Sequence, residues 1–545
     1  MNSEITKQKK TESHGKKMVK GVAIMSIAGI ISKFLGAIFR IPLANWIGAK
    51  GMSYYSAAYS IYSFFLFISM AGLPVAISRM ISERNAIGDE RNLKRVFKVS
   101  LILMVSLGTI SATILLISAK TISQKIANPG AYLSMIALVP VLVFAPLGAS
   151  LRGYFQGRQN MLPTGLSEIL EQFFRVVVGL FLAYYFLNKS LVKASAGATF
   201  GASVGSFAAM ILMVTIYIKS KNRDENPVNY KYEKESIRSI FKELIYISVP
   251  ITIGSSILPI VFMIDAAMIM PRLQATGWSV GESKVLYGLL GGYCYPITEF
   301  PQIFTIAVAV SMVPAVAEAI KKNDRMSLES NIDVGMKSLM LISFPCMVGL
   351  FVMAHPVLDL LYPARPREID LAAPILQILA VGMIAFSMLR AFSSMLQGAG
   401  KQLIPVRNLA IGAATKISIT YILVGVNSIN VKGAALGNIA AYFVTALLNY
   451  ISVRKYIGVK INAKEILIKP FAISICMGIM TLGVYKILGL LIEPGSILTM
   501  ISIIFAAFSY FILVFVTGYI SKADMEFIPY GDKLYRIAKK MHLTR

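Results

Sequence analysis

Residues Val19–Pro42 read VKGVAIMSIAGIISKFLGAIFRIP, an apolar run that decides how the rest of the chain must fold. As a helix rising 1.5 Å per residue, this run is long enough to cross a bilayer core of about 30 Å. It nevertheless carries two cations, Lys33 and Arg40, which are seven residues apart and therefore share one helix face. A charge near the bilayer centre costs about 2.5–3.5 kcal/mol on insertion scales, so this face is predicted to line a polar cavity.

The composition indicates a polytopic membrane protein. The 545 residues are 56% hydrophobic and only 15% charged, which is too apolar for a soluble protein of this length. A net charge of +27 would favour nucleic acid as the partner of a soluble protein, but here the placement of the charges matters more than their sum, and we expect no nucleic-acid partner. The three cysteines and three histidines are scattered, so neither a disulfide framework nor a metal site is expected.

Apolar runs of about twenty residues predict an all-α fold with fourteen transmembrane helices. Residues 1–18 are polar and rich in lysine and lack the features of a signal peptide, so we expect them to form a cytoplasmic tail, as we do residues 520–545. The predicted spans are 19–41, 53–80, 96–118, 131–154, 164–187, 194–218, 243–269, 285–319, 330–354, 371–397, 405–425, 432–453, 465–488 and 496–519.

The loops between these spans support an even number of crossings. Most of the 54 Lys and Arg residues fall in alternate loops and in the two tails, as expected if these segments are cytoplasmic. Both tryptophans, Trp46 and Trp278, fall in loops on the opposite side, where interfacial aromatic residues are common. We therefore predict a multi-pass protein with both termini in the cytoplasm.

Two short motifs recur in the same order and at similar separations. The sequence QGRQNMLP at Gln156–Pro163 follows the fourth span, and QGAGKQLIP at Gln397–Pro405 follows the tenth. The pattern Gly-Ala-x-x-Gly recurs in the sixth and twelfth spans, at 197–201 and 433–437. Both motifs are also ordinary helix-end and helix-packing sequences, which is the alternative to a true repeat.

The repeat predicts two pseudo-symmetric six-helix lobes followed by two further helices. The lobes are residues 19–240 and 241–460, and the added pair of helices occupies 461–519. Because six is an even number, both lobes keep one orientation in the membrane and are related by an axis along its normal, which is a common plan of transporters.

Lys and Arg residues inside the spans are the candidate binding groups. Arg175 and Lys416 lie at matching places in the fifth and eleventh spans, so we expect a cation from each lobe to face one central space. Glu171 precedes Arg175 by four residues and Glu168 lies a turn further back, which leaves open whether Arg175 forms an ion pair or faces a substrate. The residues of this kind are Lys33, Arg40, Arg175, Lys337, Arg390, Lys416 and Lys486.

Acidic residues inside the spans are fewer. Asp265 lies in the seventh span, and Glu299 lies in the eighth, between Pro296 and Pro301. Prolines so close together free backbone carbonyls and kink a helix, as transporters do beside cavities and hinges. Glu299 could balance a cavity cation or carry a proton. Arg79, near the cytoplasmic mouth, could reach lipid headgroups or guide an anionic substrate inward.

Several cations facing one space suit an anion, and guanidinium groups suit phosphate oxygens in particular. The chain contains no GxxxxGK[ST] motif and no large soluble domain, so we expect no ATP and no cofactor. It also lacks an extramembrane catalytic domain, so we predict that it is not an enzyme.

Five segments together carry a family resemblance. The chain resembles the multidrug, oligosaccharidyl-lipid and polysaccharide exporter superfamily. Within it, the chain is most similar to the polysaccharide-synthesis branch, which contains the stage V sporulation protein B type and the MurJ-type lipid II flippases. The segments are spread over both lobes: SKFLGAIFRIPL (32–43), GLPVAISRMISE (72–83), SEILEQFFRV (167–176), YPITEFPQIFTIAVAVSMVPAVAEA (295–319) and MLQGAGKQLIPV (395–406).

The resemblance implies fourteen helices and export of a lipid-linked sugar diphosphate across the bacterial cytoplasmic membrane. In MurJ-like members, essential arginines of helices one, two and eight face a central cavity. Lys33 and Arg40 fit the first helix, and Arg79 is the nearest match in the second. The eighth helix departs from this pattern, because it offers Glu299 and no arginine. Cations of the fifth, tenth and eleventh helices, Arg175, Arg390 and Lys416, are the candidates to replace it.

The mechanism expected for such a protein is alternating access, in which two lobes rock around a headgroup while the polyprenyl tail stays in lipid. The membrane potential or an ion gradient would drive it, and the sequence does not specify the coupling ion. Lipid II is the first candidate substrate, and another polysaccharide or spore-cortex precursor is the alternative. An ion-coupled multidrug antiporter would be expected to have twelve helices and an acidic cavity. A membrane scaffold or channel is the rival from a different class.

Overall fold

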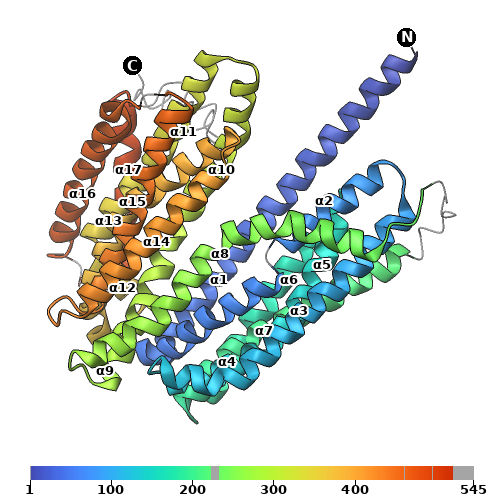
Figure 1. Cartoon of the computed structure of the whole chain (residues 1–545). Coiled ribbons are helices and arrows are strands. Elements are labelled where there is room, and N and C mark those ends of the chain that lie inside the picture. Colours follow the sequence, from blue (N-terminus) through green and yellow to red (C-terminus); the bar gives the residue numbers. More distant parts are fainter. Residues whose placement is uncertain are drawn as a thin grey trace. The chain divides into compact units, whose positions relative to one another are not determined.

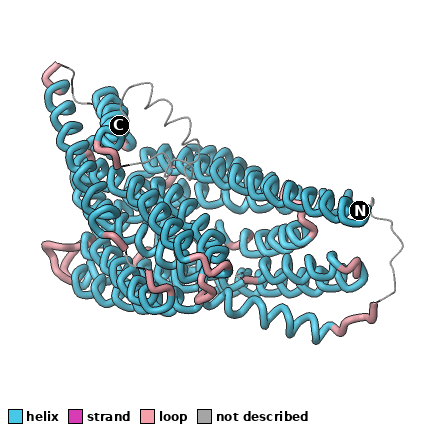
Figure 2. Tube along the Cα trace, turned by 90° about the horizontal axis from the view of Figure 1, so that it is seen from above, coloured by secondary structure: helices cyan, strands magenta, loops and turns pink. Residues whose placement is uncertain are grey.

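The computed structural model describes residues 2–70, 72–221, 232–459, 461–491, 493 and 495–519, and the predicted C-terminal tail lies outside them. Within these ranges the chain consists of helices and connecting turns without strands (Figures 1 and 2). The chain divides into two compact units, Met1–Met270 and Pro271–Arg545. The division falls inside α8, further along the chain than the lobe boundary expected from the repeat, and the predicted lobe boundaries stay a prediction.

The first unit is a bundle of helices that begins with a long, bent helix. This helix, α1, bends at Gly48, whose φ of 62° is a left-handed conformation that glycine adopts without strain. The described elements are α1 (Asn2–Met70), α2 (Leu73–Ala86), α3 (Glu90–Lys125), η1 (Pro129–Ala131), α4 (Tyr132–Leu138), α5 (Val141–Gly157), α6 (Leu162–Leu187), α7 (Leu191–Lys221) and most of α8 (Ile237–Ala275).

The second unit is also helical and contains two π-helical turns, η2 and η3. The turn η2 ends at Cys294, two residues before Pro296, so the irregular backbone expected near the eighth-span prolines lies on their N-terminal side. The elements are α9 (Val280–Gly288), η2 (Leu289–Cys294), α10 (Tyr295–Lys321), α11 (Arg325–Val352), α12 (Ala354–Leu361), α13 (Pro366–Gly398), α14 (Leu403–Val424), α15 (Lys432–Tyr456), η3 (Lys464–Ile468), α16 (Lys469–Leu488) and α17 (Ser496–Val516).

The described residues of the fourteen predicted spans are almost entirely helical. Within the described ranges, eleven helical stretches are long and apolar enough to cross a membrane. One of them, Ile27–Ala86, holds the second predicted span and, before the Gly48 bend, residues 27–41 of the first. The predicted spans 243–269 and 405–425 lie on α8 and α14, which are helical but are not among the eleven. The prediction of an all-α polytopic membrane protein is therefore confirmed.

The two Gln-Gly motifs occupy equivalent places in the two units. A Cβ atom added at Gly157, the end of α5, would lie 2.7 Å from Cβ of Ile81 in α2. A Cβ atom added at Gly398, the end of α13, would lie 2.9 Å from Cβ of Val316 in α10. In each unit this glycine therefore lets the fourth span approach the second closely, as the predicted repeat requires.

The outward faces of the helices are apolar, as lipid contact requires. On α3, Ile110, Ile114 and Ile117 form an exposed stripe at helical spacing, whereas Met104 and Leu115 are fully buried. The buried face of α3 also contains glycine, serine and alanine residues, which allow close contact between membrane helices.

Candidate functional site

Arg175 lies midway along α6. Among the predicted cations of the first unit, it is the one whose side-chain contacts are best defined. Its Nη2 donates a hydrogen bond to the hydroxyl oxygen of Tyr59 and lies 3.5 Å from the hydroxyl oxygen of Tyr55. Its Cζ atom lies 4.8 Å from the centre of the Tyr59 ring. The two tyrosines are one turn apart on α1, with ring centres 4.7 Å apart, so both reach the same guanidinium. We call these three residues the Arg175 cluster.

Glu171, one turn before Arg175, pairs with a different arginine. Its Oε2 accepts a hydrogen bond from Nη2 of Arg152 in α5 at 2.7 Å. The Nε of Arg152 also donates to the Ser167 hydroxyl at 3.0 Å. The ion pair between Glu171 and Arg175 that the sequence allowed is therefore not formed. Glu171 balances the charge of Arg152, and the charge of Arg175 faces neutral tyrosines.

Close packing of α6 against α7 positions both charged side chains. A Cβ atom added at Gly201 would lie 2.5 Å from the carbonyl oxygen of Arg175, and one added at Gly205 would lie 2.3 Å from the carbonyl oxygen of Glu171. Small residues at four-residue spacing allow such backbone contact between membrane helices. Gly201 of the Gly-Ala-x-x-Gly motif and Gly205, four residues later, thus hold the backbone that carries the charges.

The second unit repeats this arrangement around Lys416. A Cβ atom added at Gly437 of α15 would lie 3.2 Å from the carbonyl oxygen of Lys416 in α14. Gly437 therefore approaches Lys416 as Gly201 approaches Arg175. The predicted equivalence of the two cations is supported by the backbone contact that each one makes. The Lys416 side chain is 3% exposed.

Lys33 and Arg40 lie on the part of α1 that precedes its bend. Lys33 is exposed and Arg40 is half-buried. Phe39, the neighbour of Arg40, is 2% exposed, and its ring centre lies 6.0 Å from that of Tyr55. The backbone of Arg40 is therefore close to the part of α1 after the bend, which carries the tyrosines of the Arg175 cluster.

Two arginines of α2, at the end of the second predicted span and just after it, have different surroundings. Arg79 is exposed and pairs at 2.9 Å with Glu83, one turn later on α2. Arg84 is buried, and its Nη2 lies 2.6 Å from Glu235 and 2.8 Å from Glu243. Glu243 belongs to α8 and Glu235 lies just before it, so Arg84 fastens the end of α2 to the start of α8.

Arg390 on α13 is half-buried and faces an aromatic ring. Its Cζ atom lies 5.0 Å from the centre of the Phe386 ring. Among the described residues no acid lies within ion-pair distance of Arg390, and its buried Nε has no hydrogen-bond partner there. Like Arg175, this guanidinium is held by an aromatic neighbour and keeps its positive charge uncompensated within its unit.

The two predicted acids lie on different units and have different exposure. Asp265 is 4% exposed on α8 in the first unit. Glu299 lies on α10 in the second unit, one turn after η2, and its side chain is exposed there. The grouping of Lys33, Arg40, Arg79, Arg175, Arg390 and Lys416 around one space stays a prediction.

Neutral amides join three helices at the matching level of the second unit. Asn408 of α14 is fully buried and donates to Oδ1 of Asn449 in α15 at 2.9 Å. Asn449 in turn donates to the hydroxyl oxygen of Ser393 in α13 at 3.0 Å. A second, weaker contact at 3.4 Å joins Asn408 to Ser452. This network takes the place that charged residues occupy in the first unit.

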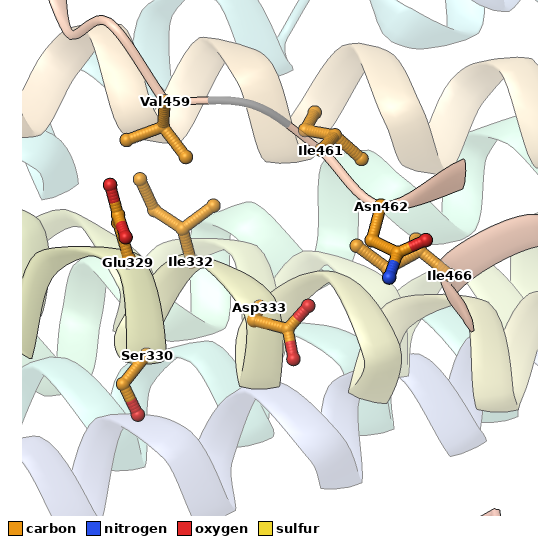
Figure 3. Close-up of a pocket in the computed structure, with 8 residues that line it drawn as sticks. All are labelled: Glu329, Ser330, Ile332, Asp333, Val459, Ile461, Asn462 and Ile466. Atoms are coloured by element: carbon orange, nitrogen blue, oxygen red, sulfur yellow. The ribbon is translucent and has the colours of Figure 1, made fainter. Parts of the chain in front are cut away.

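A cavity of about 260 Å³ lies in the second unit, where α11 faces the chain that follows α15 (Figure 3). Its polar lining includes the carboxylates of Glu329 and Asp333 and the amide of Asn462. Glu329 pairs with Arg325 at 2.7 Å, and Asp333 pairs with Lys337 at 2.7 Å. The charged groups among the described residues that line it are these two carboxylates, which do not attract an anionic headgroup. Among the described residues, no three His, Cys, Asp or Glu side chains are grouped to hold a metal ion.

Comparison with known families decides the assignment of the chain. A sequence model of the family described as polysaccharide biosynthesis protein matches residues 18–319, which is more than half of the chain. The chain belongs to the polysaccharide biosynthesis protein family. A MatE model also matches residues 291–422. The family resemblance expected from the five quoted segments is confirmed.

Two relatives and one solved structure span almost all of this polysaccharide biosynthesis protein. It is 25% identical to stage V sporulation protein B of Bacillus subtilis (strain 168), over 84% of this chain and 88% of that protein. It is 26% identical to the lipid II flippase MurJ of the same organism, over 90% of this chain and 93% of that protein. A structure of lipid II flippase MurJ in an inward closed conformation has the same fold, with a TM-score of 0.68 at 15% identity, covering 90% of this chain and 98% of that one.

These matches place the chain among multi-pass membrane transport proteins and not among enzymes. Sequence reasoning missed Tyr59, Arg84 and Arg152. The spacing of Tyr55, Tyr59 and Tyr62, which places three hydroxyls on one helix face, was the available signal for the first. Arg84 and Arg152 were missed because they fall among the positive charges that are expected in cytoplasmic loops.

Proposed function

We propose that this polysaccharide biosynthesis protein is a flippase that exports a lipid-linked sugar diphosphate, with the peptidoglycan precursor lipid II as its substrate, across the bacterial cytoplasmic membrane. The observation that carries the proposal is that guanidinium groups within its spans are held by neutral aromatic side chains. Arg175 contacts Tyr59, and Arg390 contacts Phe386. Charges that no carboxylate cancels within their own unit can attract a diphosphate.

In this proposal each predicted residue has a role. The cations Lys33, Arg40, Arg79, Arg175, Arg390 and Lys416 contact the diphosphate or guide it inward. Glu299 and Asp265 balance the charge of the empty site or carry a coupling ion. The sugar and diphosphate cross between the two lobes by alternating access, while the polyprenyl chain and membrane lipids remain in contact outside.

The membrane potential is the proposed driving force. With both termini in the cytoplasm and the inside negative, an anion gains about 2.3 kcal/mol per charge for each 100 mV when it moves outward. A cationic empty site must then return against the same field, so an ion that moves with it completes the cycle. The proposal requires neither ATP nor another cofactor.

The test is complementation of a bacterium from which its lipid II flippase is depleted, with lipid II measured on the outer leaflet. Expression of this chain should restore outward lipid II. The variant Arg40→Ala should reduce the restored flux by about tenfold or more, because charge-assisted hydrogen bonds to phosphate are strong. Failure to restore flux, with the protein shown to be folded in the membrane, would contradict lipid II as the substrate.

A different lipid-linked precursor is the second candidate. The match to stage V sporulation protein B covers 84% of this chain, nearly as much as the match to MurJ, at 25% against 26% identity. A spore-cortex or other polysaccharide precursor would contain the same diphosphate and polyprenyl chain, so the cation arrangement suits it equally. Complementation of a strain defective in sporulation, with no effect on vegetative lipid II flux, would favour this candidate.

A further inference from the structure

The Arg175 cluster differs chemically from two other arginine sites of the first unit. Arg152 is paired with Glu171, and Arg84 with Glu235 and Glu243. Arg175 forms no ion pair with a described acid, and its polar partners are the hydroxyls of Tyr59 and Tyr55. A carboxylate neutralises a guanidinium, whereas a phenol leaves its full charge in place.

The side chains of the cluster also contain several hydrogen-bond donors. Arginine has five N–H donors and no acceptor, and Nη2 is the atom that contacts both tyrosines. When a tyrosine oxygen accepts from arginine, its own O–H hydrogen remains available as a donor. The cluster therefore has hydrogen-bond donors to offer a third group, which is what the oxygens of a phosphate need.

The cluster is rigid on two sides and partly open. Tyr55 is 2% exposed, and Gly201 brings α7 against the backbone of Arg175. The side chains of Arg175 and Tyr59 are only half-buried, so a ligand can still reach them. The Tyr59 ring beneath the guanidinium plane, 4.8 Å from Cζ, limits the directions in which the fork can point.

We propose that Arg175, Tyr59 and Tyr55 form an anion site within the first unit that takes a phosphate group, and that Tyr59 is the residue that positions the Arg175 fork. The site deepens the proposed function, because a lipid-linked diphosphate is one source of such a phosphate. A phospholipid headgroup is the other source with the same chemistry. The binding of phosphate at this place does not depend on which precursor is exported.

The test is calorimetric titration of inorganic pyrophosphate into the purified full-length protein in phosphatidylcholine nanodiscs. Arg175→Gln should raise the Kd about tenfold or more, because it removes the charge and the fork. Tyr59→Phe keeps the ring and should raise the Kd about three- to tenfold. Tyr185→Phe is the matched control, since Tyr185 lies on the exposed side of α6, and its Kd should equal that of the unchanged protein.

Arg175→Lys keeps the charge without the fork and separates the two contributions. It should bind pyrophosphate more tightly than Arg175→Gln and less tightly than the unchanged protein. It also serves if Arg175→Gln does not fold. Equal Kd values for the unchanged protein, Arg175→Lys and Tyr59→Phe would overturn the proposal. A Kd raised equally by Tyr185→Phe and Tyr59→Phe would overturn the positioning role of Tyr59.

A second titration in nanodiscs containing phosphatidylglycerol identifies the source of the phosphate. If the site prefers the substrate diphosphate, this anionic lipid should leave the pyrophosphate Kd of the unchanged protein within about twofold of its value in phosphatidylcholine. A large rise that disappears in Arg175→Gln would assign the site to lipid headgroups and overturn the link to the substrate. If the chain binds pyrophosphate as expected but does not restore lipid II flux in the complementation assay, the proposed function would be contradicted and the phosphate site would stand.

Discussion

The two units build the same helix contacts with different polar chemistry. In the first unit, α5 and α6 are joined by a charged contact between Arg152 and Glu171. At the matching level of the second unit, α13, α14 and α15 are joined by the neutral amides of Asn408 and Asn449. The difference shows that similar backbone packing is compatible with different polar contacts. In the first unit Glu171 pairs with Arg152, which leaves Arg175 without a carboxylate partner among the described residues.

The loops after the second span of each unit also differ, because the arginine near each loop is buried in one unit and exposed in the other. Asp89 in the first unit and Asp324 in the second each cap the following helix, accepting at 3.0 Å from backbone nitrogens three residues later. In the first unit the nearby Arg84 clamp is buried. In the second unit Arg325 is exposed and donates to the carbonyl oxygens of Ile457 and Gly458 at 2.8 and 2.7 Å.

The largest expected effect tests this contrast. Arg84→Ala leaves Glu235 and Glu243 without their cation, and we expect it to lower the free energy of unfolding by about 3 kcal/mol. Arg325→Ala removes an exposed group and should cost about 1 kcal/mol or less. Unfolding of the purified protein in mixed detergent micelles measures both. Similar losses of unfolding free energy for the two variants would show that Arg325 stabilises the protein as much as Arg84 does.

The second prediction concerns the two glycines that approach the paired cations. Gly201→Ala places a Cβ against the backbone of α6, which cannot rotate away, and should cost about 2 kcal/mol. In Gly437→Ala the nearest atom is the hydroxyl oxygen of Thr420, 2.3 Å away, and this side chain can turn. The loss for Gly437→Ala should therefore be smaller, about 1 kcal/mol. The double variant Gly437→Ala with Thr420→Ala provides the control, because it should recover part of that loss.

The third prediction removes the acid of the charged contact. Glu171→Gln leaves the half-buried Arg152 without its carboxylate and should cost about 1–2 kcal/mol. Because Glu171 does not contact Arg175, pyrophosphate binding should be unchanged. Adding Arg152→Gln should restore part of the stability, as a double-mutant cycle would show. A higher Kd for pyrophosphate in the single variant Glu171→Gln would indicate that Glu171 influences the Arg175 cluster directly.

The smallest expected effect belongs to the neutral network. Asn408→Ala removes one partner of Asn449 and should cost about 1 kcal/mol, since hydrogen bonds between membrane helices contribute modestly. The same unfolding assay measures it, with Asn449→Ala as the companion variant. A loss larger than that of Glu171→Gln would reverse the comparison, because the neutral contact would then be the stronger of the two.

The fold could be predicted in detail, whereas the candidate site could be predicted only in outline. The fourteen spans follow from runs of apolar residues, and their described residues are almost entirely helical. The equivalence of Arg175 and Lys416 follows from their spacing after Pro163 and Pro405, and Gly201 and Gly437 make matching backbone contacts with them. The partner of Arg175 did not follow, because a glutamate four residues earlier was the obvious choice from sequence.

The sequence by itself determined that the chain is a polytopic helical membrane protein of this family, because transfer of each span into lipid depends on the composition of that span alone. It also determined which residues are cations within the membrane. The tertiary structure decided which of them are neutralised. Glu171 lies one turn from Arg175, yet α5 brings Arg152 to it, and α1 brings Tyr59 to Arg175. Such choices depend on neighbouring helices and side-chain direction, which local spacing does not specify.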